Sequence, residues 1–371
     1  MISAAVGAAS CRLVKNQNLV AYWRDGKFFI EEFRSRQRVI AAASYAEILD
    51  AFRKPRSIAS VTRALPYERA SLKRAIADLC ARDMLVAENR RKFRTSISEL
   101  WRGSFAAAYY HFSTRDVPYS DDPIVQGTRF RHQLANDPQP GCYKDYLKTR
   151  TVVLSKRTPS ARMPLHAVLG RRRTVRDFAA RKLPAAELAT LVRGTWGQTG
   201  WVDGGLLGPL IAKTSPSAGA RHPIECYALI WAVSGIRPGL YHYGVRRNAL
   251  ERLRDGDFRE EAVRFAGGQG FVRNAAFLCV MTAVADRVFW KYSSSDAYRL
   301  FFLDAGHLAQ TFLLLATARN LGAFTTAAMK ESAIEEFIGV DGVREFPVYL
   351  CGAGRLRQPP SPVRASTRRA S

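Results

Sequence analysis

A run of basic residues at positions 171–178 has the composition of an anion-binding segment. It reads Arg-Arg-Arg-Thr-Val-Arg-Asp-Phe and follows a stretch whose apolar spacing is typical of a helix. Guanidinium groups donate N–H groups in pairs and the threonine adds a hydroxyl, so the segment suits the oxygens of a phosphate monoester. A solvated basic turn would have the same composition. The segment therefore indicates a phosphate site only if neighbouring motifs agree.

Two later segments are rich in small residues. Residues 214–223 read Thr-Ser-Pro-Ser-Ala-Gly-Ala-Arg-His-Pro and precede an apolar, strand-like run. Residues 321–329 read Leu-Gly-Ala-Phe-Thr-Thr-Ala-Ala-Met and follow a long helical pattern. Small side chains let backbone amides come close to a flat ligand, although an ordinary loop has the same composition.

Lys291 and Tyr292 stand side by side before the serine run at 293–295. Taken alone, the pair reads as a surface turn that leads into a helix. A tyrosine has an ordinary pKa of about 10 and can act as a base near neutral pH only beside a cation that lowers this pKa. Lys291 would supply that cation.

Three histidines, His222, His242 and His307, lie beside these segments. A buried, hydrogen-bonded histidine is commoner than a catalytic one, and we expect that outcome at all three positions. No cluster of histidine, cysteine or carboxylate has the spacing of a metal site, so we expect no metal. The six cysteines form no CxxC pair, which argues against a disulfide framework and predicts a reducing, cytoplasmic setting.

The composition is that of a globular, strongly basic protein. The chain has 371 residues, is 47% hydrophobic and carries a formal net charge of +25. This charge would attract nucleic acid, acidic peptides or phosphorylated ligands, and a solvated surface would carry it equally well. The most apolar later stretch, 308–318, is too short to span a bilayer, so we expect no membrane segment.

Residues 1–95 have the pattern of a small winged-helix-like module. Residues 19–30 predict a hairpin around Asp25-Gly26, and a capping box formed by Ser44 and Glu47 predicts the start of a helix. Two further helical faces precede a strand-like run at 84–86. A module of this shape can read DNA or hold a peptide as an added strand.

The remaining chain divides by composition into three parts. Residues 96–160 predict a connecting region with one helix. Residues 161–357 predict helices around a mainly antiparallel central sheet, which is an α+β layout. Residues 358–371 are rich in proline, serine and arginine and predict a disordered tail.

Five motifs in this order resemble the SagB-type branch of the FMN-dependent nitroreductase superfamily. They are Arg-Arg-Thr-x-Arg-x-Phe at 172–178, Pro-Ser-Ala-Gly-Ala at 216–220, Gly-Leu-Tyr-His-Tyr at 239–243, Lys-Tyr at 291–292 with the later Asp-Ala-Gly-His, and Gly-x-Gly-Arg at 352–355. The resemblance covers about half of the chain. One departure is that Ala-Gly-Ala-Arg-His-Pro replaces the commoner Asn-x-Gln after Pro-Ser.

The resemblance implies a role for each motif. The phosphate of FMN would be held by Arg172, Arg173, Thr174, Arg176 and Arg355. The flavin ring would be bordered by Pro216, Ser217, Ala218, Gly219, Ala327 and Ala328, with Met329 as an alternative to the last two. Lys291 and Tyr292 would be the catalytic pair of enzymes that oxidise thiazolines and oxazolines.

The function that follows is oxidation of azoline rings in a precursor peptide, alongside a cyclodehydratase, by a homodimer that returns electrons to oxygen. The reaction needs removal of a carbon-bound proton and transfer of a hydride to flavin. Two alternatives stay open, a general NAD(P)H-dependent nitro or quinone reductase and a flavin-containing DNA-binding regulator. We do not expect nucleic acid as a partner, because residues 72–75 are only modestly basic for a recognition helix.

Overall fold

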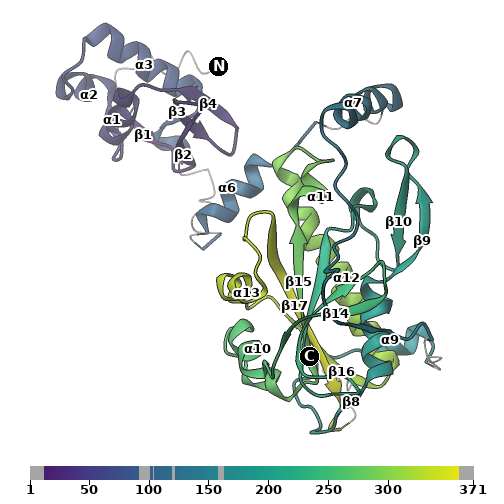
Figure 1. Cartoon of the computed structure of the whole chain (residues 1–371). Coiled ribbons are helices and arrows are strands. Elements are labelled where there is room, and N and C mark those ends of the chain that lie inside the picture. Colours follow the sequence, from purple (N-terminus) through teal and green to yellow (C-terminus); the bar gives the residue numbers. More distant parts are fainter. Residues whose placement is uncertain (1–11, 92–100, 103, 119–121, 158–162, 359–371) are drawn as a thin grey trace. The chain divides into compact units, whose positions relative to one another are not determined.

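The chain folds into two compact units, Met1–Val117 and Pro118–Ser371 (Figure 1). The computed structural model describes residues 12–91, 101–102, 104–118, 122–157 and 163–358. The boundary between the units falls within the connecting region expected at 96–160. The tail for which we predicted disorder lies, beyond residue 358, outside the described residues.

The N-terminal unit contains two small sheets and a set of helices. Its sheets have the strand orders β5-β1-β6 and β2-β3-β4. The strands are β1 (Arg12–Lys15), β2 (Leu19–Arg24), β3 (Lys27–Glu32), β4 (Gln37–Ile40), β5 (Arg56–Ser57) and β6 (Leu85–Ala87). The helices are α1 (Ala43–Ala51), α2 (Ile58–Ala64), α3 (Arg69–Ala81), α4 (Glu88–Arg91) and α6 (Phe105–Ser113).

Local sequence explains most of this unit. Asp25 and Gly26 both have positive φ, 50° and 70°, which is the two-residue turn that matches strand twist and was expected between β2 and β3. The order of three helices and a strand was also expected. The capping box was wrong: α1 begins at Ala43, its N-cap is Ala42 without a side-chain bond, and Ser44 lies inside the helix.

The C-terminal unit is built on a seven-stranded sheet with the order β16-β17-β15-β11-β13-β14-β7, in which all neighbouring strands are antiparallel. Its strands are β7 (Thr151–Val153), β11 (Ile224–Ile230), β13 (Gly239–Gly244), β14 (Ala249–Asp255), β15 (Phe277–Val284), β16 (Leu321–Thr326) and β17 (Glu345–Arg355). Two short pairs accompany it, β8 (Leu183–Pro184) with β12 (Val233–Ser234) and β9 (Gln198–Asp203) with β10 (Pro209–Lys213).

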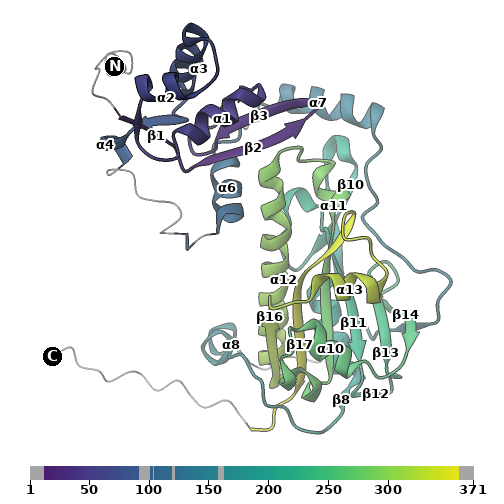
Figure 2. The same ribbon diagram turned by 90° about the vertical axis from the view of Figure 1, so that its left-hand side faces the viewer.

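Helices cover both faces of this sheet (Figure 2). One core contains side chains of α9 (Ala185–Trp196) and α12 (Tyr298–Ala318), and the other contains side chains of α10 (Arg259–Phe265) and α13 (Glu331–Ile338). The remaining helices are α7 (Pro123–Asn136), α8 (Leu165–Arg171), α11 (Ala285–Phe289) and the 3-10 turns Gly205–Leu207, Ala218–Ala220, Gly270–Asn274 and Ser295–Ala297. The predicted α+β fold with a mainly antiparallel sheet is confirmed.

Within the described residues, one helical stretch, Ser295–Ala318, is long and apolar enough to cross a membrane by composition alone. Its buried residues include Phe301, Leu308 and Phe312, which belong to the core between α12 and the sheet. This packing is that of a core helix.

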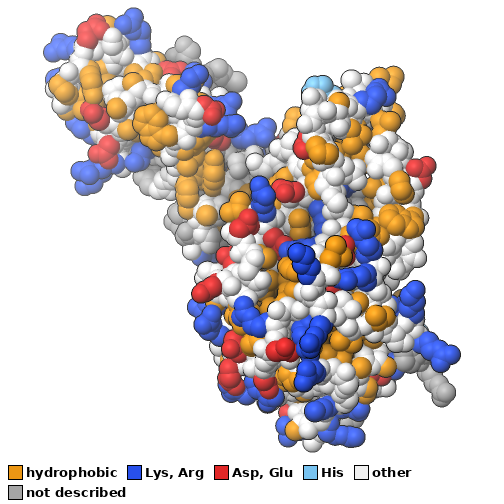
Figure 3. Space-filling view, in the orientation of Figure 1, with side chains coloured by type: hydrophobic (Ala, Val, Ile, Leu, Met, Phe, Trp, Pro, Cys, Tyr) orange, Lys and Arg blue, Asp and Glu red, His pale blue; other side chains and the backbone are white. Residues whose placement is uncertain are grey.

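Basic side chains are spread over the visible face of each unit rather than gathered into one patch (Figure 3). Acidic side chains lie between them on both units. The net charge therefore does not form a single stripe on this face.

Candidate active site

The arginine-rich segment lies against the outer strand of the large sheet. The backbone N–H of Val175 donates to the carbonyl of Ala323 in β16 (2.9 Å), and Phe178 forms a bridge with Leu356 just beyond β17. Gly322 lies opposite Val175, where a Cβ would come within 2.8 Å of the valine side chain. The strand and the segment can lie this close because the residue between them is glycine.

The arginines of this segment have no carboxylate partner among the residues that the structure describes, and Asp177 pairs instead with Arg357 (2.8 Å). Arg173 donates to the backbone carbonyl of Arg172, and the guanidinium of Arg176 lies 5.6 Å from the ring centre of Phe271. Unneutralised guanidinium groups close together suit a phosphate. The donor set fits the phosphate of a mononucleotide cofactor.

A second group of residues gathers around the loop that follows β10. Asp304 of α12 accepts hydrogen bonds from the hydroxyl of Ser217 and the N–H of Ala218. The N–H of His222 donates to Ser217 Oγ (2.8 Å). Burial raises the pKa of Asp304, and the Ser217 hydrogen bond opposes this shift. A carboxylate from the long helix therefore fixes the shape of the loop.

The same loop contains strained backbone. Gly219, Ala220 and His222 have positive φ values of 58°, 53° and 44°. Positive φ is uncommon outside glycine, and such strain collects at functional sites because the surrounding structure must hold it.

Gly219 packs directly against the Lys291–Tyr292 pair. A Cβ at Gly219 would lie 2.5 Å from Lys291 Nζ and 2.6 Å from Tyr292 Oη, so any larger residue would have to displace the ends of these two side chains. The two motifs are far apart in sequence, and the fold brings them together. The lysine ammonium and the tyrosine hydroxyl thus face the glycine of the small-residue loop.

The pair follows the short helix α11, and the backbone N–H groups of both residues donate to the carbonyl of Val288. Lys291 Nζ lies 5.6 Å from the ring centres of Tyr292 and of Phe130 in α7. Burial, and then the charge of Arg221, lower the pKa of Lys291. The Lys291 ammonium therefore lies near two aromatic rings and is half-buried.

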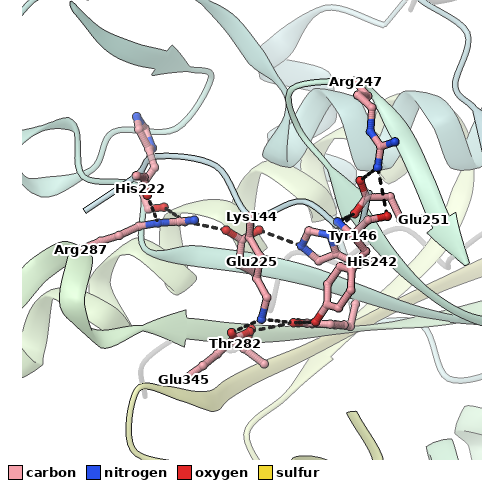
Figure 4. Close-up of polar contacts among 12 residues, drawn as sticks. Lys144, Tyr146, His222, Glu225, His242, Arg247, Glu251, Thr282, Arg287 and Glu345 are labelled. Carbon is pink, nitrogen blue, oxygen red and sulfur yellow. Dashed lines mark hydrogen bonds and ion pairs between the residues drawn. The ribbon is translucent and has the colours of Figure 1, made fainter. Parts of the chain in front are cut away.

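A buried ion-pair network supports this arrangement, and sequence reasoning missed it (Figure 4). Arg287 of α11 pairs with Glu225 of β11 (2.6 Å) and donates to the carbonyls of Gly141 (3.0 Å) and His222 (3.1 Å). Arg221 Nε in turn donates to the Arg287 carbonyl (3.1 Å). Arg287 therefore ties the helix that precedes Lys291 to the strand and to the loop.

His242 of β13 lies in the same network between two carboxylates. Its Nδ1 is 2.8 Å from Glu251 and its Nε2 is 3.1 Å from Glu225. Carboxylates only accept, so both ring nitrogens carry protons and His242 is a cation. Burial lowers the pKa of His242, but the hydrogen bonds to Glu225 and Glu251 outweigh it and the pKa is raised.

The three histidines differ from one another. His222 and His242 are buried and hydrogen-bonded, as expected. Burial, and then the charge of Lys213, lower the pKa of His222 to about 3. The expectation was wrong for His307, which is exposed on α12 because it lies on the helix face turned away from the sheet.

The predicted residues fall into two groups that lie apart within one chain. Arg171 contacts Asn320 just beyond the C-terminus of α12 (3.5 Å), whereas Ser217 contacts Asp304 near its N-terminus. Sixteen residues separate Asp304 from Asn320, which is about 24 Å along a helix. Arg355 lies with the first group, because it pairs with Leu321 at the start of β16.

Ala327 and Ala328 follow β16 at its far end. Thr326 is the last residue of that strand and pairs with Leu350. The N–H of Ala328 donates to the Thr326 hydroxyl (3.1 Å). The two alanines therefore lie about five residues, or roughly 17 Å, along the strand from the arginine segment.

Comparison with known proteins identifies the class. The nitroreductase family profile matches residues 169–355, half of the chain. The chain is 30% identical over 191 residues to MJ1384, a protein of Methanocaldococcus jannaschii named as a nitroreductase, and the match covers 52% of this chain and 90% of that protein. The chain belongs to the nitroreductase family.

Other relatives match more of the chain. The trifolitoxin operon protein TfxC of Rhizobium leguminosarum bv. trifolii is 25% identical over 310 residues, which covers 80% of this chain and 85% of that protein. A solved structure from Anabaena variabilis, also named as a nitroreductase, has a TM-score of 0.52 at 22% identity and covers 69% of this chain and 48% of its own. The TfxC match supports the SagB-type branch that the motifs resemble.

Proposed function

We propose that the protein is an FMN-dependent dehydrogenase that oxidises peptide-borne thiazolines or oxazolines to thiazoles or oxazoles. The observation that carries this proposal is the contact of Lys291 and Tyr292 with Gly219. It joins the expected catalytic pair to the loop expected to border the flavin. The match to a trifolitoxin operon protein over most of the chain supports a peptide as the substrate.

The unneutralised arginines of the first group support our proposal for the cofactor residues. Arg172, Arg173, Thr174 and Arg176 would hold the FMN phosphate, with Arg355 beside them at the end of β17. A bound FMN would accept the hydride that azoline oxidation releases. Pro216, Ser217, Ala218 and Gly219 would border the ring on one side, and Ala327 and Ala328 on the other.

Lys291 and Tyr292 would act on the substrate. Oxidation of an azoline removes one carbon-bound proton and one hydride, so a base must stand beside the ring. Tyr292 would take the proton on Oη as a tyrosinate, and the charge of Lys291 would lower the pKa of Tyr292 so that this anion is available before the reaction. Both side chains adjoin the loop, which supports this role.

A homodimer would complete the site. Within one chain the phosphate group and the Gly219 loop are about 24 Å apart along α12. The exposed face of that helix carries Phe302 (47% exposed) and Leu303 (55% exposed), together with Gly306, beside which there is open space. A second copy packed on this face would bring its Gly219 loop toward the arginines of the first.

The test is oxidation of a synthetic thiazoline-containing peptide by the purified, FMN-loaded protein in air. Mass spectrometry should show the loss of two hydrogens per ring. A cyclodehydratase, which would form the azolines in a precursor peptide, is the expected partner. No mass loss on thiazoline or oxazoline peptides would refute the proposal.

A general nitro or quinone reductase is the second candidate, because MJ1384 is named as a nitroreductase. That function predicts rapid NADPH oxidation with nitrofurazone or menadione and no activity on azolines. We do not favour a DNA-binding regulator, since basic residues form no single stripe on the face seen in Figure 3.

A further inference from the structure

Among the described residues, the strand β2 of the N-terminal unit pairs with β3 alone, because its sheet has the order β2-β3-β4, and its other edge is free. The two-residue turn makes Arg24 and Lys27 a hydrogen-bonded pair. At the other end of the two strands, the N–H of Phe33 donates to the Asn18 carbonyl (3.0 Å), so every second residue of β2, counted from Asn18 to Arg24, bonds to β3. Residues 19, 21 and 23 are therefore the ones whose backbone groups point away from β3.

A cleft lies along this edge. Its volume is about 480 Å³, which is within the range of ligand pockets. Ile30 of β3 and Leu49 of α1 are buried apolar side chains in its lining, and Leu19 and Ala21 of β2 complete that side. The cleft is therefore bounded by an open strand edge on one side and a helix on the other.

The rim of the cleft is cationic. Lys15 and Arg53 are among its lining residues, and the lining contains no carboxylate. Two carboxylates of β3 lie near the cleft in register. Glu31 pairs with Val20, lies on the opposite face of the sheet and accepts from Tyr22 (3.0 Å). Glu32 pairs with Leu19 on the same face as Ile30, but it is buried and accepts from the N–H of Ser35 (2.7 Å). The free edge thus combines backbone donors and acceptors with an apolar floor and two positive charges.

An exposed aromatic ring, that of Trp23, stands at the end of this edge and on the same face of the sheet as Ala21. Trp23 is 72% exposed and lies two residues beyond Ala21 on the same face of β2. A chain laid along β2 would meet the cleft first and the indole next.

We propose that this cleft binds an extended segment of an acidic peptide, which adds to β2 as a further strand. Its backbone would pair with Leu19, Ala21 and Trp23. An apolar side chain would lie over Ile30 and Leu49, and a neighbouring carboxylate would meet Lys15 and Arg53. The proposal rests on the proposed function only in taking the peptide substrate as the occupant.

The edge is tested in the full chain with a fluorescein-labelled synthetic peptide in which leucine and glutamate alternate. Ala21→Pro removes one outward N–H and puts a proline ring on the edge, but leaves the ladder to β3 intact. Peptide affinity, measured by anisotropy, should fall by about tenfold or more. The matched control is Ile40→Pro on β4: Ala41 donates to Phe28, so the N–H of Ile40 points away from β3 on the opposite edge.

Affinity should stay within about twofold of wild type in Ile40→Pro. Equal weakening by both prolines, weakening by Ile40→Pro alone, or no saturable binding of the peptide would overturn the proposal. Circular dichroism checks that each variant is folded. If Ala21→Pro does not fold, the Arg53→Glu variant described next tests the proposal instead.

Arg53→Glu reverses one rim charge at an exposed position of the helix end. It should weaken binding of the leucine–glutamate peptide by about tenfold at low salt and strengthen binding of a leucine–lysine peptide. Lys54→Glu, the same reversal at the next residue, which does not line the cleft, is the control and should have less effect. An equal response from both variants would refute a site at the cleft.

The two proposals fail separately. If Ala21→Pro loses the peptide but wild type oxidises no azoline, the cleft stands and the dehydrogenase function falls. If wild type oxidises azoline peptides but Ala21→Pro binds peptide normally, the function stands and the cleft falls.

Discussion

At the scale of single residues, the contact between Gly219 and the Lys291–Tyr292 pair links two motifs for which the sequence shows only their order along the chain. Their identities were predictable because small residues and a lysine–tyrosine pair are visible in the chain. Their contact was not, because more than seventy residues separate them.

The supporting charges were harder to find. Glu225 and His242 each appear as one ionisable residue within a strand pattern, and Arg287 follows Asp286 in a short helix. Sequence alone does not reveal that they pair, since burial of a charge is stable only with a partner contributed by another element.

The first residue-scale prediction concerns Gly219. Gly219→Ala places a Cβ against Lys291 and Tyr292 at a positive φ, so it should displace the pair and lower turnover by about 10²-fold. Gly235→Ala is the control, since Gly235 has φ 79° but open space around it. Equal turnover in the two variants would show that the contact does not matter to catalysis.

The second concerns the phosphate group. Arg172→Ala with Arg176→Ala removes two charge-assisted contacts, each worth about 1.5–3 kcal/mol, so most flavin should be lost from the purified protein. Arg357→Ala is the matched control, because Arg357 lies nearby but pairs with Asp177. The 450 nm region of the absorbance spectrum reports the flavin content. Full flavin content in the double variant would contradict the assignment.

At the scale of elements, strands with strong apolar patterns were predicted and weakly patterned ones were not. The apolar runs at 225–233, 239–243 and 276–284 are visible as strand patterns in the sequence, and they correspond to β11, β13 and β15. The β16 strand was missed because four of the six residues of Leu321–Thr326 are glycine, alanine or threonine, and the segment gains strand structure from pairing with β17. The helix α1 begins before Ser44 because tertiary packing of Ile48 and Leu49 outweighs the local cap.

The His242 network predicts a pH dependence at this scale. The pKa of His242 is raised in the folded protein, so its contribution to stability is fully present below the unfolded pKa of about 6.5 and is lost as pH rises through the folded pKa. The thermal unfolding temperature should therefore fall as the pH rises above about 6.5. Burial lowers the pKa of Lys213 to about 8. Above that pH the titration of Lys213 raises the stability as pH rises, which is opposite to the effect of His242.

The measurement is therefore made below about pH 8, by circular dichroism in a buffer series. His242→Gln cannot titrate, so it should lack this slope while being less stable overall, because Glu225 and Glu251 lose a buried cation. An identical slope in wild type and His242→Gln would show that another group titrates.

At the scale of the whole molecule, the proposed site needs two copies of the chain. Leu303→Asp places a charge on the exposed face of α12 without entering the core. It should convert a dimer to a monomer and lower flavin content together, because the partner's loop would be lost from the site. Light scattering with absorbance detection measures both. A wild-type monomer that retains flavin would contradict the shared site.

The central claim is that Lys291 and Tyr292 act on the substrate, and Tyr292→Phe tests it most directly. The substitution keeps the ring and removes only the oxygen, so folding and flavin content should be unchanged. Turnover of a thiazoline peptide, measured as loss of two hydrogens per ring by mass spectrometry, should fall by about 10²–10⁴-fold, the usual range for general acid–base catalysis. Near-normal turnover by flavin-loaded Tyr292→Phe would contradict the account.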